Sequence, residues 1–187
     1  AADYAEAAVP GTLSIPAGRS FTTWAGWLLP YDRDIYLILR DDRPNAVREL
    51  LRDLAGIGLD RVAGIAAAGV IDGWRASGRP LQTLRDVEAG QVERALRDRT
   101  ALVLDVRGEG EWAAGHLPGA RNLPLGELDE RLDEIPHDRP LIVHCQSGSR
   151  AAIAASLLRA RGHGDVRAYG GGFAEWQTAG YPVELPS

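Results

Sequence analysis

The feature that most constrains the fold of this chain is an internal repeat. Four segments of its first part resemble four segments of its second part in the same order, at offsets that fall from 108 to 102 residues. Short insertions and deletions in loops produce such a shrinking offset, and about 100 residues is a typical domain size. The chain is therefore predicted to hold two copies of one folding unit. The paired segments are 9–16 with 117–124, 35–38 with 141–144, 58–62 with 162–166, and 73–80 with 175–182.

The second copy alternates short apolar runs with amphipathic stretches. This alternation is typical of an α/β fold in which helices cover both faces of a parallel sheet. Strands are expected at 101–104, 141–144 and 166–169, and helices at 86–98, 125–135 and 149–161, with a helical turn at 111–114 and a helix around Trp176.

The first copy is expected to be incomplete at its N-terminal side. Residues 1–8 align with 109–116, and nothing in the sequence aligns with the apolar segment 102–107. We therefore predict two domains, a truncated one at 1–82 and a complete one at 83–187. The first alanine-rich residues also suggest a fragment of a longer protein.

Cys145, the only cysteine of the chain, lies between the apolar strand 141–144 and the helix 149–161. A sulfur nucleophile reacts as the thiolate, and the free N–H groups and dipole of a helix N-terminus favour an anion. Gly148 allows the loop to curl, and successive backbone N–H groups in such a loop form an anion-binding nest. We expect Cys145 to be the nucleophile and Arg150 to add positive charge at the rim.

At this point the second copy resembles the rhodanese-like sulfurtransferases. The resemblance covers about 100 residues, and it implies that Cys145 accepts sulfane sulfur as a persulfide. The loop residues Gln146, Ser147, Gly148, Ser149 and Arg150 would bind the substrate, with Asp105 and Arg107 in support. The matching motifs are Asp105-Val-Arg107, Glu111, Gly115-His-Leu-Pro-Gly-Ala120, Cys-Gln-Ser-Gly-Ser-Arg at 145–150, Gly170-Gly-Gly-Phe173 with Trp176, and Gly180-Tyr-Pro-Val183.

The first copy resembles a degenerate, catalytically inactive member of the same family. Leu39 stands near the position of Cys145, and the acidic pair Asp41 and Asp42 would repel an anionic persulfide. The segment 20–29 further resembles multidomain proteins that join a metallo-β-lactamase-fold domain to two rhodanese units. Such an upstream domain is an expected partner and could hold a metal, whereas no cofactor and no metal site are expected in this chain.

Several neighbouring residues have structural interpretations beside the chemical ones. Asp105 and Arg107 are as well explained by a structural hydrogen-bonded pair as by direct chemistry. His144 is expected on the opposite face of the strand from the loop, and His116 is expected to brace its loop. Gly170-Gly-Gly-Phe173 is read as a tight turn first and a substrate wall second.

Composition excludes several classes of function. The net charge of −5 and the lack of a basic block argue against nucleic acid as a partner, and no apolar run approaches the ~20 residues of a membrane helix. A single cysteine excludes an internal disulfide and is typical of a reducing compartment, so a cytoplasmic location is expected. The expected partners are a small sulfur donor, such as thiosulfate or a low-molecular-weight persulfide, and a thiol or cyanide acceptor.

Two other functions remain open at this level. A cysteine-dependent phosphatase or arsenate reductase also uses a strand, loop and helix with Cys and Arg. Those families place five residues between Cys and Arg, whereas four separate Cys145 from Arg150 here. The second alternative is a non-catalytic rhodanese-like binding module, against which the intact Cys145 loop argues.

Overall fold

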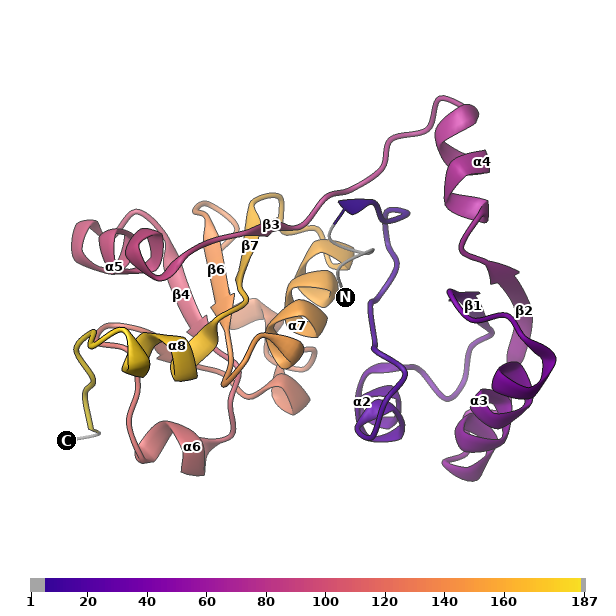
Figure 1. The fold of residues 1–187 in the computed structure, drawn as a ribbon, viewed down its shortest axis with the longest axis horizontal. Helices are drawn as coiled ribbons and strands as arrows, with labels where there is room; N and C mark the ends of the chain where they lie inside the picture. Colours follow the sequence, from indigo (N-terminus) through magenta and orange to yellow (C-terminus); the bar gives the residue numbers. More distant parts are fainter. Residues whose placement is uncertain (1–5, 186–187) are drawn as a thin grey trace. The chain divides into compact units, whose positions relative to one another are not determined.

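The computed structural model describes residues 6–185, which form two compact units (Figure 1). The C-terminal unit contains residues 82–185 together with 6–14, and the N-terminal unit contains residues 15–81. The sequence placed residues 6–14 in the first copy. They instead contact the C-terminal unit, because Ala8 forms an antiparallel bridge with Gln82 and the N–H of Ser14 donates to Oγ of Ser156 at 3.0 Å.

The C-terminal unit is built on a five-stranded sheet with the order β3-β7-β6-β4-β5, in which every neighbouring pair is parallel. All four residues of the central strand β6 are buried. Such continuous apolar strands are typical of parallel sheets covered on both faces. The strands are β3 (Arg85–Asp86), β4 (Leu102–Asp105), β5 (Arg121–Asn122), β6 (Leu141–His144) and β7 (Val166–Tyr169).

Helices cover this sheet on both sides, as the sequence predicted. In Figure 1, α7 lies on one side, and α5 and α8 lie on the other. Small and apolar residues are buried around most of α7, which lets this helix pack closely on β6 and β7. The helices are α5 (Ala89–Asp98), α6 (Glu109–Ala113), α7 (Ser149–Ala160) and α8 (Gly172–Thr178).

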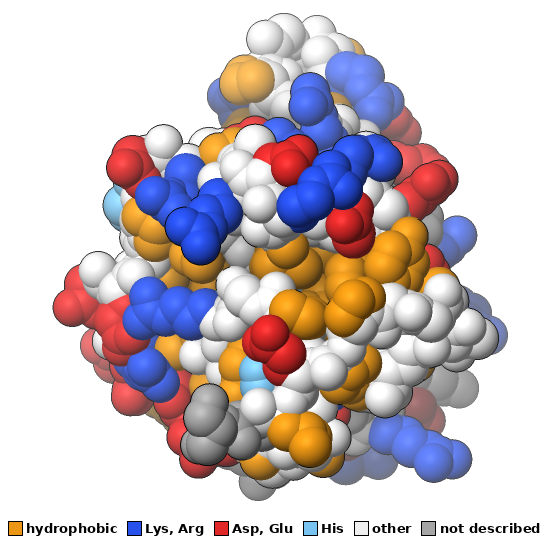
Figure 2. Space-filling model, turned by 90° about the vertical axis from the view of Figure 1, so that its left-hand side faces the viewer, with side chains coloured by type: hydrophobic (Ala, Val, Ile, Leu, Met, Phe, Trp, Pro, Cys, Tyr) orange, Lys and Arg blue, Asp and Glu red, His pale blue; other side chains and the backbone are white. Residues whose placement is uncertain are grey.

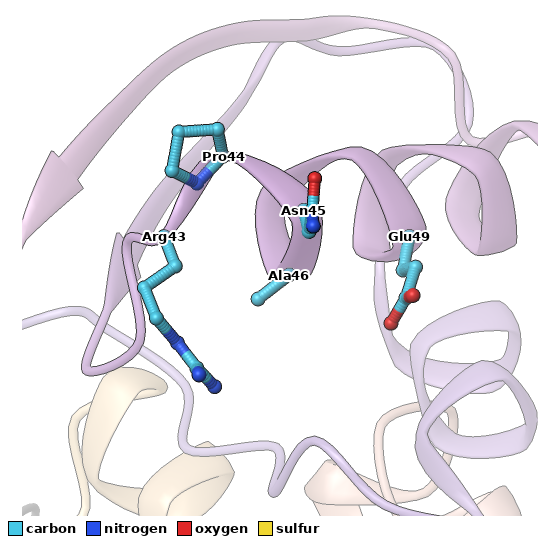
Figure 3. Close-up of a pocket in the computed structure, with 5 residues that line it drawn as sticks. All are labelled: Arg43, Pro44, Asn45, Ala46 and Glu49. Atoms are coloured by element: carbon cyan, nitrogen blue, oxygen red, sulfur yellow. The ribbon is translucent and has the colours of Figure 1, made fainter.

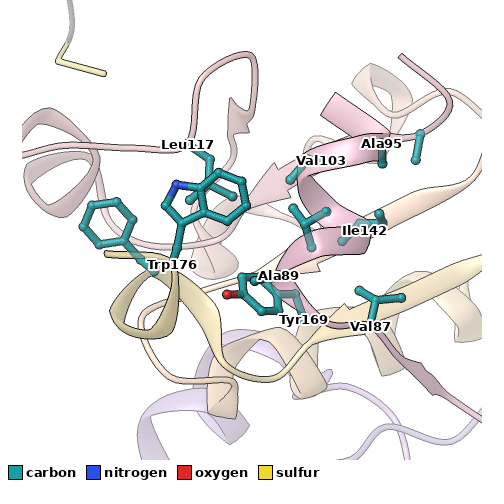
Figure 4. Close-up of a cluster of buried hydrophobic side chains, with 11 residues drawn as sticks. Val87, Ala89, Ala95, Val103, Leu117, Ile142, Tyr169 and Trp176 are labelled. Carbon is teal, nitrogen blue, oxygen red and sulfur yellow. The ribbon is translucent and has the colours of Figure 1, made fainter. Parts of the chain in front are cut away.

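The main core cluster lies between the sheet and the helices α5 and α8 (Figure 4). Trp176 is its largest member, and the indole N–H donates to the carbonyl of Pro182 at 2.7 Å. Tyr181 stacks on the Trp176 ring with 4.5 Å between centroids. The chain after α8 is thereby fastened to the core. The buried members are Val87, Ala89, Val92, Ala95, Ala101, Val103, Leu117, Ile142, Tyr169, Phe173 and Trp176.

Three elements of the C-terminal unit differ from expectation. The helix predicted at 125–135 is instead two short 3₁₀ turns, Leu125–Glu127 and Leu132–Glu134. Gly126 and two Asp residues in this segment have low helix propensity, which explains the interruption. The strands β3 and β5 were not predicted, because two polar residues form a strand only when a neighbour is present to pair with them. That neighbour is β7 for β3 and β4 for β5.

The N-terminal unit contains a two-stranded parallel sheet with three helices. Its small core is made of Ala25, Ile35, Leu54 and Leu59. Pro44 begins α3 at a position where its missing N–H costs no helical hydrogen bond. The elements are α2 (Phe21–Leu28), β1 (Ile35–Leu39), α3 (Pro44–Gly56), β2 (Val62–Ala67) and α4 (Val70–Ala76).

Helices were predicted on both faces of each sheet, and in the N-terminal unit this expectation fails. Tyr36 is 73% exposed and Ile38 is 40% exposed, so the face of β1 that carries them is open. The strand β6 at the corresponding repeat position is buried on both faces. The physical reason is that the described part of this unit contains no helix packed over that face.

Both units contain the same succession of parallel strand, helix, parallel strand and helix. In the N-terminal unit this succession is β1, α3, β2 and α4, and in the C-terminal unit it is β6, α7, β7 and α8. In each unit a tryptophan of the last helix donates its indole N–H to a proline carbonyl six residues later, Trp74 to Pro80 at 3.0 Å and Trp176 to Pro182 at 2.7 Å. Common descent of the two units stays a prediction, and this shared contact is consistent with it.

Charged side chains are mostly paired with opposite charges on the surface. Arg97 contacts Glu93 and Asp98, and Arg131 contacts Glu127 and Glu134. Figure 2 shows Arg side chains lying beside acidic ones on the face in view. Solvent and salt screen exposed pairs of this kind, so they have little influence on stability. Within residues 6–185, no helix is both long and apolar enough to cross a membrane.

We predict that Trp176→Phe lowers the free energy of unfolding by about 2 kcal/mol, because it removes buried ring volume and leaves the Pro182 carbonyl without its donor. Urea denaturation followed by circular dichroism measures this change. Trp27→Phe is the matched control, since Trp27 is 63% exposed, and it should change stability by less than about 0.5 kcal/mol. Equal effects of the two substitutions would contradict the assigned role of Trp176.

Candidate active site at the Cys145 loop

Parallel strands bring the candidate residues to one edge of the sheet. In the pairing of β4 with β6, Asp105 lies opposite His144, so Asp105 and Cys145 come to the same carboxyl edge. Ligands of open α/β sheets bind beyond this edge. Residues separated by some 40 positions in sequence therefore meet around the loop that joins β6 to α7.

The first turn of α8 holds the carbonyl groups of this loop. The N–H of Phe173 donates to the carbonyl of Cys145 at 2.8 Å, and the N–H of Ala174 donates to the carbonyl of Gln146 at 3.0 Å. A Cβ on Gly172 would lie 2.5 Å from the Cys145 carbonyl oxygen, so only glycine permits this approach. The carbonyl oxygens of the loop are thereby directed toward α8.

The backbone N–H groups of the loop, unlike its carbonyl groups, have no backbone partner within residues 6–185. Among the described residues, no backbone carbonyl accepts a hydrogen bond from the N–H groups of residues 146–149. Gly148 has a φ of +87°, which lets the loop curl into α7. Successive N–H groups left unpaired in a curled loop at a helix N-terminus form an anion-binding concavity.

Cys145 lies at the floor of the loop. The residue is 1% exposed and is not in a disulfide, whereas Ser147 and Ser149 of the same loop are exposed. Gln146 and Gly148 are partly buried. The thiol is therefore enclosed by loop backbone rather than presented on the open surface.

Arg150 is not a free cation at the rim. Its two terminal nitrogens bind both carboxylate oxygens of Glu111, at 2.6 and 2.7 Å. This pairing holds the pKa of Glu111 below its usual value. It is also the main reason that the pKa of the Arg150 guanidinium is raised, with a smaller contribution from the neighbouring Cys145 sulfur.

Asp105 and Arg107 form a buried ion pair behind the loop. Nη2 of Arg107 lies 2.6 Å from Oδ2 of Asp105, and both side chains are almost fully buried. Arg107 also donates to the carbonyl of Gly115 at 2.8 Å and lies over the ring of Phe173 at 4.0 Å. Its Nη1 reaches Oε1 of Gln146 at 3.4 Å. The pair therefore connects β4, the loop and α8, and it supports the position of the loop.

His144 is fully buried beside this ion pair. Its Nε2 lies 3.7 Å from Oδ2 of Asp105, and Nδ1 is 3.3 Å from the Cys145 carbonyl oxygen. Burial lowers the pKa of this imidazole, and the nearby Asp105 carboxylate opposes that effect only in part. His144 is therefore neutral near pH 7. His116 braces its own loop, since it stacks on Trp112 with ring centroids 3.6 Å apart.

The corresponding loop of the N-terminal unit has a different chemistry. Leu39 ends β1, and Asp41 is bound by Arg43, with Nε and Oδ1 2.8 Å apart. This hydrogen bond lowers the pKa of Asp41 to about 2. Figure 3 shows a hollow at the start of α3, next to this loop. Its lining residues are Arg43, Pro44, Asn45, Ala46 and Glu49.

The sequence did not assign two features of the site. Glu111 was noted within a motif but not as a partner of Arg150, from which it is separated by 39 residues. The glycines before Phe173 were read as a turn, whereas they allow α8 to bind the loop carbonyls. The signal for the second feature was present, because three successive glycines before a helix indicate a close approach of backbone to backbone.

Known proteins resemble this chain mainly in the C-terminal unit. The model of the rhodanese-like domain family matches residues 88–179, which include every element from α5 to α8. A sulfurtransferase of Allochromatium vinosum is 32% identical over 104 residues, which are 55% of this chain and 97% of that protein. The thiosulfate sulfurtransferase GlpE of Pseudomonas fluorescens is 37% identical over 93 residues, covering 50% of this chain and 84% of that protein.

The fold is also similar to a solved structure. The crystal structure of a rhodanese-related protein from Thermoplasma volcanium matches with a TM-score of 0.51 and 30% sequence identity, covering 55% of this chain and 99% of that one. Other relatives are longer than the part that matches. The chain covers 62% of the Bacillus subtilis protein YqhL and 50% of an HTH-type transcriptional regulator of Mycobacterium tuberculosis.

We predict that Gly148→Ala costs about 2 kcal/mol more stability than Gly180→Ala. Both glycines have a positive φ, so both substitutions incur the backbone strain of a left-handed residue. Only at position 148 does the added Cβ meet backbone, 2.4 Å from the carbonyl oxygen of Gly170, whereas the space at position 180 is open. Urea denaturation of the two variants measures the difference, and equal losses would contradict this account of the loop.

The buried His144 predicts a pH dependence of stability. Its pKa is lower in the folded state than the ordinary histidine value of about 6.5, so below that pH the unfolded chain binds a proton that the folded chain excludes. The contribution of neutral His144 to the free energy of unfolding is complete above this pH. It decreases as the pH falls, by at most ~1.4 kcal/mol per pH unit. His144→Gln should flatten the fall between pH 6.5 and 5. His163, whose pKa is also lowered by burial, adds an effect of the same sign and requires a separate variant.

Proposed function

This chain belongs to the rhodanese-like family, and we propose that its C-terminal unit transfers sulfane sulfur through a persulfide on Cys145. The proposal rests on the loop backbone that surrounds Cys145, the only cysteine of the chain. Its loop carbonyls are bound by α8, and the N–H groups of residues 146–149 have no backbone acceptor within the described chain. Such a site suits an anionic sulfur in a small space.

The proposed reaction has two steps that return the enzyme to its starting state. The Cys145 thiolate attacks the outer sulfur of thiosulfate, a sulfur–sulfur bond forms to Cys145, and sulfite leaves with the electron pair of the broken bond. Cyanide or a thiolate then attacks the terminal sulfur of the persulfide. Thiocyanate or a new persulfide is released, and the Cys145 thiolate is regenerated. No proton or external electron is needed in either step.

The residues around Cys145 have distinct proposed roles. The backbone N–H groups of residues 146–149 stabilise the negative charge on the terminal sulfur, as preorganised donors do for developing anions elsewhere. Gly148 permits the required curvature. Arg150 lies near the sulfur as a cation paired with Glu111, while Asp105 and Arg107 position the loop and do not touch the reacting atoms. The exposed side chains of Ser147 and Ser149 are proposed to meet the donor at the entrance.

We propose that the N-terminal unit is an inactive rhodanese-like domain. Leu39 has no group that can carry sulfur, and the adjacent Asp41 and Asp42 disfavour an anion. The repeat of sequence segments and the shared tryptophan-to-proline hydrogen bond support common descent. An upstream metallo-β-lactamase-fold domain and a cytoplasmic location stay predictions. The first rests on residues 20–29, and the second rests on the single free cysteine.

Thiosulfate is the first donor to test, because one similar protein is named a thiosulfate sulfurtransferase. We expect the chain to gain the mass of one sulfur atom after incubation with thiosulfate, and to release thiocyanate when cyanide is added. Cys145→Ser should lose both signals while keeping its circular dichroism spectrum, since the change replaces one atom. Residual transfer by this variant would contradict the roles proposed for Cys145 and for the N-terminal unit.

The same assay decides between the proposed reaction and its alternatives. Turnover of a generic aryl phosphate with no transfer from thiosulfate or from an alkyl persulfide would favour a phosphatase. A folded protein with neither activity would favour a binding module. The four residues between Cys145 and Arg150 favour a loop that holds one sulfur atom over one that holds a tetrahedral phosphate.

A further inference from the structure

Two guanidinium groups lie close to the Cys145 loop, and each is already bound to a carboxylate. Arg107 is paired with Asp105 behind the loop, and Arg150 is paired with Glu111 beside it. Within the described chain, the remaining loop residues at 146–149 carry no formal charge. The side chains around the sulfur therefore sum to zero, although the sequence of the loop suggests a cationic site.

The two carboxylates differ in how they are held. Asp105 is fully buried and accepts three kinds of N–H group from Arg107, so it belongs to the fixed framework. Glu111 lies on the short helix α6, and its side chain is 40% exposed. Apart from Arg150, it accepts a hydrogen bond from the N–H of Gly108 at 3.2 Å. Glu111 can thus be changed without opening the core.

The pairing of Glu111 with Arg150 has a consequence for the sulfur donor. A donor with a strongly anionic leaving group, such as thiosulfate, brings two negative charges to the loop. Arg150 can compensate them only by sharing or leaving its bidentate contact with Glu111, and the Glu111 carboxylate itself repels the donor. A donor with a smaller charge meets less of this opposition.

We propose that Glu111 is a specificity-determining residue that, by binding Arg150, biases Cys145 toward sulfur donors of low negative charge. This inference rests on the proposed sulfur transfer and deepens it. The favoured donor class is singly charged, such as an alkyl persulfide or an organic thiosulfonate, rather than the dianion thiosulfate. Glu111 acts on the donor through its own charge and through the orientation of Arg150.

Two donors that differ by one charge at the same position provide the test. Thiosulfate releases sulfite, and methanethiosulfonate releases methanesulfinate, in both cases after Cys145 takes the terminal sulfur. We expect Glu111→Gln to raise kcat/KM for thiosulfate relative to methanethiosulfonate by about tenfold at low ionic strength. Added salt should reduce the gain, because it screens partly exposed charges.

Glu109→Gln is the matched control. Glu109 is exposed on the same helix α6, so this substitution removes the same charge as Glu111→Gln. Glu109 does not pair with Arg150, because Glu111 occupies both terminal nitrogens of that guanidinium. It should leave the donor ratio within about twofold of wild type, as expected for a distant exposed charge. An equal rise in both variants would overturn the proposal in favour of a general effect of net charge.

Arg150→Gln tests the same idea in the opposite direction. It removes the cation and leaves the Glu111 charge near the loop, so the ratio of thiosulfate to methanethiosulfonate should fall below that of wild type. This variant keeps the test decisive if Glu111→Gln proves unstable by circular dichroism. An unchanged ratio in the folded variants would overturn the inference while wild-type persulfide formation still supported sulfur transfer. Absence of a Cys145 persulfide with either donor in wild type would instead remove the proposed function itself.

Discussion

The contact between the start of α8 and the loop after β6 is the constraint on which the rest of the site depends. Two N–H groups of α8 bind the carbonyls of Cys145 and Gln146, while the N–H groups of residues 146–149 have no backbone acceptor among the described residues. Such close backbone packing requires glycine at positions 148 and 172, where any Cβ would lie within about 2.5 Å of another backbone atom. Loop shape is therefore determined by backbone, and side chains then modify its charge.

The buried pair of Asp105 and Arg107 secures this contact from behind. A buried ion pair adds little net stability, because desolvation offsets the attraction, yet it is costly to break. Its bonds to the Gly115 carbonyl, to Gln146 and over the Phe173 ring join three separate segments. The pair thus contacts the loop, the Gly115 segment and α8 at once, so breaking it would disturb all three.

The two units share one order of strands and helices, but their strands β6 and β1 are buried to different extents. In the C-terminal unit, β6 has a paired strand on each side and helices over both faces. In the N-terminal unit, β1 pairs only with β2, and Tyr36 and Ile38 remain exposed. Leu39 ends β1 in this unit, whereas the only cysteine of the chain lies in the C-terminal unit.

The sequence by itself determined the order of the elements and the position of the candidate nucleophile. Local patterns of hydrophobic periodicity and glycine placement predict these features. They are the apolar runs at β4, β6 and β7, the helix α7, and the cysteine loop between β6 and α7. The interrupted segment at 125–135 was misread because its apolar spacing also fits a helix. Only the tertiary structure decided that Glu111 neutralises Arg150 and that α8 orients the loop carbonyls. These partners are far apart in sequence, and the parallel sheet brings them together by aligning the carboxyl ends of its strands.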